Sequence, residues 1–145
     1  MIHHEFLEEG RTINQYVYLD ILRRLREAIR LKRPELWEKK EWILLHDNAR
    51  PHKALSVRQY FAKHGTAELP HPPYSPDLSP PDYFLFPKMK SFMKGTKFDD
   101  VNAIKEKSKV ILRSIPRTEF AKCFEQLKRR WERCVEAQGS YFENY

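Results

Sequence analysis

The sequence predicts an α/β domain whose small sheet contains parallel strands. Short apolar runs at 2–7, 42–45 and 66–69 alternate with longer segments in which apolar residues recur every three or four positions. This alternation is typical of parallel pairing, because each helix returns the chain to the start of the next strand. A chain of 145 residues, 41% of them hydrophobic, has room for one domain with its own core.

The first helix is predicted to begin shortly after the strand at 2–7. Thr12 and Gln15 fit a capping box, in which the glutamine side chain returns to the Thr12 amide. The helix then extends to about Arg33, and Pro34 either ends it or begins a new turn. Its predicted inward face consists of Val17, Ile21, Leu25, Ala28 and Ile29.

A second helix is predicted after the strand at 42–45. Pro51 suits a first helical position, and Gly65 is placed to end the helix. The inward face is marked by Ala54, Val57 and Phe61. Five of the ten prolines then fall within 70–80, which predicts an ordered extended loop because proline fixes φ and lacks a backbone donor.

The C-terminal part of the chain is predicted to be helical. Pro87 should delay or kink a helix that ends near Gly95, and Asp99 or Asp100 should cap the next one. The inward residues of these last two helices are predicted to be Val101, Ile104, Ile111 and Ile115, then Phe120, Phe124, Leu127, Trp131 and Val135. Gly139 ends the last helix, and Tyr141 and Phe142 are expected to dock back on the domain.

The charge balance favours a polyanionic partner. The chain has 27 basic and 20 acidic residues, a net charge of +7 and a pI near 9.4. Residues 23–40 contain eight basic and three acidic side chains. A surface that follows nucleic-acid phosphates and an ordinary solvated basic face both explain this concentration.

Several classes of protein are excluded by the sequence. No apolar run approaches the roughly 18 residues of a membrane span, and the acidic N-terminal residues do not resemble a secretory signal. Cys123 and Cys134 lie eleven residues apart in one predicted helix, so about 16 Å separates them and no disulfide is expected. Such thiols indicate a reducing compartment, the cytoplasm or the nucleus.

Two aspartates are the candidate site. Asp47 follows the apolar run at 42–45, where open α/β sheets place their ligands, and Asp82 begins a predicted helix after two prolines. Two carboxylates on rigid elements can share a hard cation such as Mg²⁺. Position alone makes a turn residue the commoner role for each, but Asp47 stands within the segment 46–52 (HDNARPH), and the segment 74–80 (YSPDLSP) closely precedes Asp82.

These two segments, and the 34 residues between Asp47 and Asp82, resemble the signature motifs and the spacing of mariner-family transposases. The resemblance covers nearly the whole chain, and a histone-methyltransferase fusion protein has a similar transposase-derived half. It implies a ribonuclease-H-like catalytic domain, here incomplete over residues 1–145, with the first two strands, the first catalytic aspartate and the helix-turn-helix modules absent. The chain is therefore expected to be inactive alone.

The resemblance also implies a chemistry for individual residues. Asp47 and Asp82 match the second and third metal-binding aspartates of a site for Mg²⁺ or Mn²⁺, which would serve DNA cleavage and strand transfer. Asn48, Arg50 and His52 flank Asp47. They would either support the metal site or contact DNA phosphates, or they would instead cap the following helix.

Three functional readings remain open from the sequence. The first is a transposase remnant that acts on DNA in the nucleus, as a homodimer or beside an intact transposase. The second is a non-catalytic module that binds DNA or protein and uses the same fold. The third is a truncated open reading frame without function. No membrane partner and no small-molecule substrate is expected.

Overall fold

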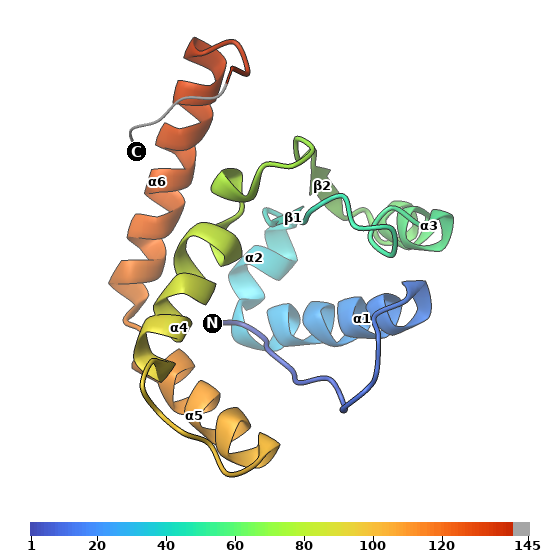
Figure 1. The fold of residues 1–145 in the computed structure, drawn as a ribbon. Helices are drawn as coiled ribbons and strands as arrows, with labels where there is room; N and C mark the ends of the chain where they lie inside the picture. The colour runs from blue at the N-terminus through green and yellow to red at the C-terminus, as the bar shows by residue number, and fades with distance from the viewer. Residues whose placement is uncertain (141–145) are drawn as a thin grey trace. The chain divides into compact units, whose positions relative to one another are not determined.

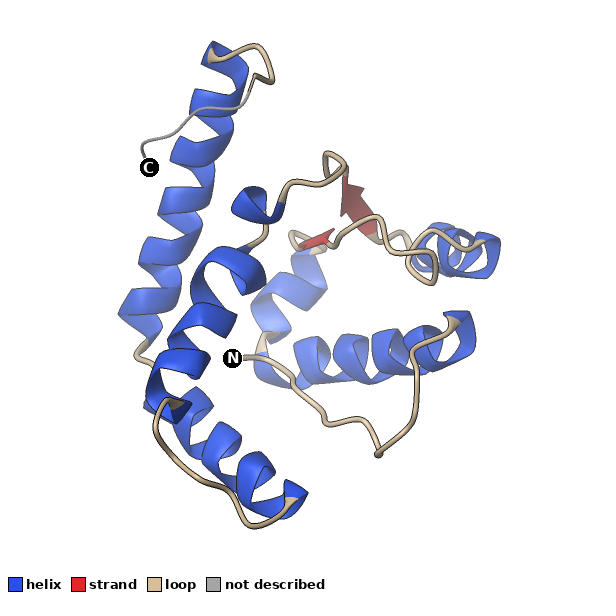
Figure 2. Ribbon diagram, viewed as in Figure 1, coloured by secondary structure: helices blue, strands red, loops and turns tan. Residues whose placement is uncertain are grey.

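The structure is a computed structural model in which residues 1–140 are described (Figure 1). The chain forms two compact units, the first comprising Met1–Pro73 and the second beginning at Tyr74. The described residues are mostly helical, with two short strands (Figure 2). None of their helices is both long and apolar enough to cross a membrane.

The first unit combines helices with a parallel pair of strands. Residue Ile43 pairs with Ala67 and Leu45 with Leu69, so the predicted parallel pairing is confirmed. The elements of this unit are α1 (Gln15–Lys32), α2 (Pro34–Lys39), β1 (Ile43–Leu45), α3 (Leu55–His64) and β2 (Ala67–Leu69). Pro34 therefore begins a new helix rather than only ending the first.

The core of the first unit lies between α1 and α3. Val57 is completely buried, and Leu22 and Phe61 are nearly so. Tyr18 and Leu19 complete this cluster from α1, with Leu44 of β1 partly buried against it. The inward face predicted for α3 is thus confirmed, while α1 also buries Tyr18, Leu19 and Leu22, which the periodicity did not select.

The cap of α1 differs from the predicted capping box. Asn14 is the N-cap, and its side-chain oxygen accepts hydrogen bonds from the amides of Tyr16 and Val17 at 3.0 and 2.9 Å. Gln15 does not return to the Thr12 amide; its side-chain oxygen accepts a hydrogen bond from Ser56 Oγ at 3.1 Å. Asparagine two residues later is the better cap, because it satisfies two amides at once.

This cap can be tested by substitution. Asn14→Ala should lower the free energy of unfolding by about 1 kcal/mol, because two helix-terminal amides lose their acceptor. Thr12→Ala should change it by less than about 0.5 kcal/mol. Urea denaturation of both variants measures the difference, and a larger loss for Thr12→Ala would restore the capping box.

The strand predicted at 2–7 is wrong. No strand of the described residues lies beside this segment, so its backbone has no ladder to join. Side chains attach it to α1 instead: Lys32 Nζ donates to the Ile2 carbonyl, and Arg24 forms an ion pair with Glu5 at 2.7 Å.

The helix predicted to begin at Pro51 starts later, at Leu55. Residues 50–53 form a turn in which the amides of His52 and Lys53 donate to the Ala49 carbonyl at 2.9 and 3.2 Å. The turn is favoured because the Asp47 side chain already accepts the Ala49 amide at 3.0 Å and starts the bend. Gly65 ends α3 with a φ of 61°, as predicted, because glycine lacks a Cβ and takes a positive φ without strain.

The second unit is helical. A buried residue, Leu78, anchors the turn that precedes the helices. The elements are a 3₁₀ turn η1 (Pro76–Leu78), a π-helical turn η2 (Pro81–Leu85), α4 (Phe86–Met93), α5 (Val101–Ser114) and α6 (Arg117–Glu136). The π-helical turn ends at Leu85 and Pro87 lies in the first turn of α4, so the α-helix begins after Asp82, as the predicted delay requires.

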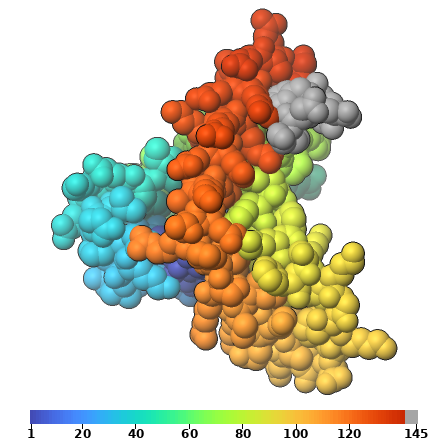
Figure 3. All heavy atoms as spheres, turned by 90° about the vertical axis from the view of Figure 1, so that its left-hand side faces the viewer, coloured from blue at the N-terminus to red at the C-terminus, as the bar shows by residue number. Residues whose placement is uncertain are grey.

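The long helix α6 lies beside α4 on the surface of this unit, as the orange-to-red and yellow-green atoms of Figure 3 show. Lys88 of α4 forms an ion pair with Glu119 of α6. The predicted proline break is confirmed, since Ile115 and Pro116 are extended between α5 and α6.

The inward faces of α5 and α6 are only partly as predicted. The cap of α5 is Asp100, whose side chain accepts the Ala103 amide at 2.7 Å. Predicted core residues that are exposed instead are Val101, Ile104, Phe124 and Val135. Those that are buried are Ile111, Ile115 and Leu127, joined by Ser108, Leu112 and Cys123. Val101, Ile104 and Val135 lie near the ends of their helices. Phe124 lies within α6, where Cys123 and Leu127 form the buried face instead. Tyr141 and Phe142 lie outside the described residues.

Candidate functional site

Asp47 lies on the loop that directly follows β1. Its Oδ1 accepts the Ala49 amide at 3.0 Å, and His52 Nδ1 lies 2.6 Å from the same oxygen. The second contact is an ion-pair distance without hydrogen-bond geometry. Burial raises the pKa of this carboxyl, but the Ala49 amide and the neighbouring histidines outweigh it, so the pKa lies below its ordinary value. The side chain is 57% exposed, which leaves an ionised carboxylate accessible to a ligand.

The preceding residue, His46, is fixed in the interior by both of its ring nitrogens. Its Nδ1 lies 2.6 Å from the Tyr18 hydroxyl and its Nε2 lies 2.6 Å from Glu68 Oε1, with only 7% of the side chain exposed. An ionised glutamate only accepts hydrogen bonds, so Nε2 carries the proton. In the neutral ring Nδ1 then accepts from Tyr18, and the tautomer of His46 is set by its two partners.

Lys53 and His52 complete this network. Lys53 Nζ lies 2.6 Å from the Glu68 oxygen that also binds His46. The His52 ring stacks on that of His46 at 5.1 Å and lies 4.1 Å from the Tyr18 ring. The loop that bears Asp47 is thereby attached to α1, to β2 and to the turn before α3.

The network makes the stability of the first unit dependent on pH. Burial lowers the pKa of His46 below its ordinary 6.5, despite the opposing effect of Glu68. Burial raises the pKa of Glu68, but the hydrogen bonds from Lys53 and His46 outweigh this effect. The pKa of Glu68 therefore lies below 4.5. A folded pKa below the unfolded value means that the unfolded chain binds more protons on acidification, so stability falls as pH falls.

We therefore expect two losses of stability on acidification. The first begins below pH 6.5, as His46 is protonated, and the second below about pH 4.5, as Glu68 and Asp47 are protonated. Urea midpoints measured between about pH 8 and pH 3 test this expectation. His46→Gln should reduce the upper loss and leave the lower one unchanged, with His64, whose pKa burial also lowers, accounting for the remainder. An unchanged upper loss in this variant would exclude His46 as its source.

The residues flanking Asp47 have different surroundings. Asn48 Nδ2 donates to the His71 carbonyl at 2.8 Å and attaches the loop to the proline-rich segment. Arg50 is exposed and His52 is mostly buried. None of the three caps α3, whose N-cap is Ala54. The helix-capping interpretation is therefore wrong. Asn48 and His52 instead make contacts that support the loop bearing Asp47.

Asp82 belongs to the second unit, in the first turn of η2. It is exposed, and its amide donates to the Ser79 carbonyl at 2.9 Å. The next residue, Tyr83, donates its hydroxyl proton to the Cys123 carbonyl of α6 at 2.8 Å. Arg130 of α6 donates to the Asp77 carbonyl at 3.1 Å and lies 4.0 Å from the centre of the Tyr83 ring. Contacts from α6 thus fix the turn that bears Asp82.

Asp47 and Asp82 lie in different units, and each is described within its own unit. A shared metal would require the two carboxylates to lie within roughly 8 Å of each other. This approach remains a prediction. Within residues 1–140, no three histidine, cysteine or acidic side chains are grouped closely enough to bind a metal ion.

Four supporting residues were not identified from the sequence: Tyr18, Lys53, Glu68 and Arg130. Glu68 did carry a signal, since it is a charged residue inside a short strand and pairs with Leu44. Side chains two residues apart share a face of a strand, so His46 follows Leu44 towards the same side as Glu68. Tyr18 and Arg130 gave no such signal, because their partners are distant in the sequence.

Comparisons with known proteins identify the family of the chain. Residues 1–39 match a family model described as transposase (partial DDE domain). The histone-lysine N-methyltransferase SETMAR of Homo sapiens is 36% identical over 143 residues, which are 99% of this chain and 21% of that protein. The mariner Mos1 transposase of Drosophila mauritiana is 34% identical over 144 residues, which are 99% of this chain and 42% of that protein.

Solved structures of Mos1 have the same fold. The Mos1 catalytic domain with raltegravir and Mn matches at a TM-score of 0.90 and 35% identity, over 98% of this chain and 72% of that one. A pre-cleavage Mos1 transpososome and a Mos1 paired-end complex with Mn match at 0.92 and 0.91, with 35% and 36% identity, over 98% of this chain and 42% and 41% of those chains.

These matches define part of a ribonuclease-H-like catalytic domain of the transposase class, which confirms the predicted fold class. The chain belongs to the mariner transposase family. It spans 21% of the length of SETMAR and 42% of that of the Mos1 transposase.

Proposed function

We propose that this chain takes part in metal-dependent cleavage and strand transfer of DNA, as part of a mariner-type transposase that acts in the nucleus. One observation carries the proposal. Asp47 is an accessible, ionised carboxylate directly after a parallel strand, oriented by the Ala49 amide and by His52. This is the position at which α/β sheets place their ligands.

Asp47 and Asp82 are the proposed metal ligands. Both carboxylates are exposed, and carboxylate oxygens are the ligands that Mg²⁺ and Mn²⁺ prefer. Such ions, when bound, activate an attacking oxygen and stabilise a leaving oxygen in phosphoryl transfer. The chain itself orients the carboxylates, with the His46 network behind Asp47 and the α6 contacts behind Asp82.

DNA is the proposed substrate, and another transposase chain is the proposed protein partner. The matching Mos1 structures include a transpososome and a paired-end complex, and the net charge of +7 favours a polyanion. A second copy of this chain or an intact transposase would serve as that partner.

The test is binding of Mn²⁺ to the 145-residue chain, measured from the electron paramagnetic resonance signal of the free ion. Asp47→Asn and Asp82→Asn should each weaken binding about tenfold or more, because each removes an ionised ligand. Asp99 is exposed and does not cap a helix, so Asp99→Asn is the matched control. This variant should bind Mn²⁺ like the unaltered chain. The double variant should bind little worse than either single one, since both ligands serve one site. Affinities for Asp47→Asn and Asp82→Asn that equal the control would refute the assignment.

A further inference from the structure

A hollow of about 110 Å³ lies on the first unit, and none of its lining residues belongs to the network around Asp47. It forms where two helices end, since Lys40 caps α2 and Gly65 caps α3. Besides these two caps, its lining consists of Arg26, Trp37, Trp42, His64 and Thr66. Two indole rings thus share the wall with basic side chains, and no acidic side chain is among the described residues that line the hollow.

Arg26 is held in this hollow by uncharged groups. Its Nη1 donates to Thr66 Oγ1 at 2.9 Å, and its guanidinium carbon lies 4.9 and 5.6 Å from the centres of the Trp37 and Trp42 rings. A hydroxyl oxygen and two indole rings fix a guanidinium without neutralising its charge. A donor that is ordered before its ligand arrives loses less conformational entropy on binding.

The basic residues of the segment 23–40 are used in two ways. Three arginines pair with carboxylates of the same unit: Arg23 with Asp20, Arg24 with Glu5 and Arg30 with Glu27. Within residues 1–140, neither Arg26 nor Lys40 forms an ion pair with a carboxylate. Burial, and then the charge of Arg26, lower the pKa of His64 below its ordinary 6.5, as a cation without a counter-charge does to a neighbouring imidazole.

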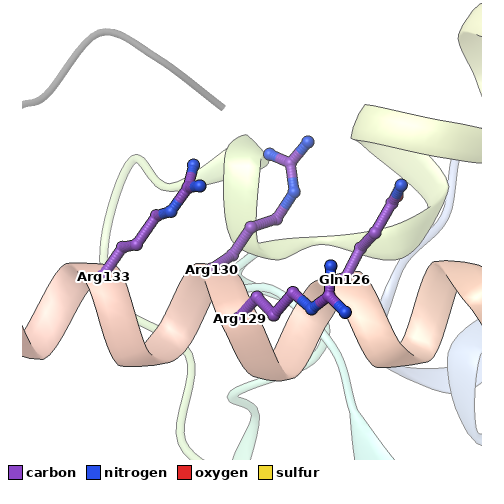
Figure 4. Close-up of a pocket in the computed structure, with 4 residues that line it drawn as sticks. All are labelled: Gln126, Arg129, Arg130 and Arg133. Carbon is purple, nitrogen blue, oxygen red and sulfur yellow. The ribbon is translucent and has the colours of Figure 1, made fainter.

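A second hollow, on α6, belongs with the site already described. It is lined by Gln126, Arg129, Arg130 and Arg133, whose side chains are drawn in Figure 4. Arg130 donates to the Asp77 carbonyl and lies over the Tyr83 ring, so it supports the turn that bears Asp82.

The surroundings of the hollow on the first unit favour a single carboxylate over a polyanion. Glu38 and Glu41 are exposed and adjoin its lining residues in the sequence, so a nucleic-acid backbone laid across it would meet two negative charges. Its volume of about 110 Å³ is well below the roughly 300–1,000 Å³ of pockets that enclose whole small molecules, and it suits one side chain. Tryptophan and arginine are also the residues that are enriched where protein partners anchor.

We propose that this hollow is a docking site for a protein partner that inserts an aspartate or glutamate side chain. The carboxylate forms paired hydrogen bonds with the Arg26 guanidinium, and Lys40 adds a second positive charge. The methylene groups of the inserted side chain lie against the two indole rings, which keep water from the ion pair and so strengthen it. Basic residues on either side of the inserted acid face Glu38 and Glu41, so the partner segment carries mixed charge. The inference goes beyond the proposed function, because it uses neither DNA nor the metal ligands.

The experiment is NMR titration of the 145-residue chain, in which the indole N–H signals of Trp37 and Trp42 and the amide signal of Gly65 are observed. The probe is a blocked seven-residue alanine peptide that carries one central glutamate between two lysines. The same peptide with a central glutamine is the control ligand. The glutamate peptide should shift the three signals saturably. The glutamine peptide should bind at least about tenfold more weakly, because it lacks the charge that pairs with Arg26.

Two variants locate the binding in the hollow. Arg26→Lys keeps the charge but loses the paired hydrogen bonds, and should weaken binding of the glutamate peptide about tenfold. Lys40→Gln should weaken it about threefold. Both Lys40 and Lys39 are exposed, so their substitution removes no packed side chain. Lys39→Gln is the matched control, since it removes the same charge from the same end of α2 without altering the lining, and should change binding less than about 1.5-fold.

The outcomes decide the proposal. The absence of a saturable shift, or equal binding of the two peptides, would rule out carboxylate docking. Equal weakening by Lys40→Gln and Lys39→Gln would assign the effect to charge at the end of α2 and overturn the proposal. A single strand of ten thymines that shifts the same signals more strongly than the glutamate peptide, at equal concentration, would reassign the hollow to nucleic acid. Mn²⁺ binding should be unchanged in Lys40→Gln, so the docking site and the proposed metal ligands are tested separately.

Discussion

His46→Ala should lower the free energy of unfolding of the first unit by about 2–4 kcal/mol. The substitution removes a buried ring that bonds Tyr18 and Glu68 at once. The buried Tyr18 hydroxyl is then left without its partner, which costs roughly 1–3 kcal/mol, while Glu68 keeps its contact with Lys53. It also removes the ring contacts with Phe61 and His52, at 5.7 and 5.1 Å. Total stabilities of about 5–15 kcal/mol make this a large fraction.

The measurement is urea denaturation followed by the fluorescence of Trp37 and Trp42, in a Trp131→Phe background that removes the signal of the second unit. His46→Gln should recover part of the loss, because its amide can still donate to Glu68. His71→Ala is the control and should cost less than about 0.5 kcal/mol. A loss as small for His46→Ala as for this control would mean that water replaces both hydrogen bonds, and the network would not support the Asp47 loop.

The parts of the fold that were predicted correctly depend on neighbours in the sequence. Gly65 ends α3 because its own backbone takes a positive φ, and Asp100 caps α5 because the Ala103 amide is three residues away. The parallel pair of strands was predicted from two apolar runs separated by a helix. Each cap is determined within about one helical turn and each apolar run within one strand, whereas the pairing of the two runs, Ile43 with Ala67, joins distant residues and follows from the order strand, helix, strand.

The errors depend on contacts with distant parts of the chain. Residues 2–7 have the composition of a strand, but a strand forms only beside a partner. Val101 has the right helical spacing but lies at the start of α5, and Phe124 is exposed because the buried face of α6 runs through Cys123 and Leu127. Tertiary packing decides such positions, and a periodic pattern gives no information about it.

The residues of the candidate site also fall into two groups: those that were predicted from the sequence and those that were found only in the structure. Asp47 and Asp82 are candidates because the segments 46–52 and 74–80 and the spacing of 34 residues resemble those of mariner transposases, and because a strand end and a proline pair precede them. The groups that orient them come from elsewhere: Tyr18 is 28 residues from His46, and Arg130 is 53 residues from Asp77. A single sequence thus reveals the carboxylates, while the structure is needed to find what fixes them.

Arg130→Gln should loosen the turn that bears Asp82, and this effect should be confined to that turn. The substitution removes a charged hydrogen bond to the Asp77 carbonyl and the cation over the Tyr83 ring, together worth about 2 kcal/mol. Local opening by this amount speeds amide exchange about 30-fold. The sensitive amides are those of Leu78, Asp82 and Tyr83, which bond to Ser75 and Ser79.

Hydrogen exchange followed by NMR measures this effect, and Arg129→Gln is the matched control. Arg129 carries the same charge on the same helix, but it does not contribute the hydrogen bond to the Asp77 carbonyl. Its substitution should change the exchange of the three amides less than about twofold. Equal acceleration in the two variants would show that positive charge on α6, and not the contact of Arg130 with the turn, governs the order of the Asp82 segment. Faster amide exchange in Arg130→Gln alone, together with weaker Mn²⁺ binding, would support a role for α6 in positioning the Asp82 carboxylate for a bound ion.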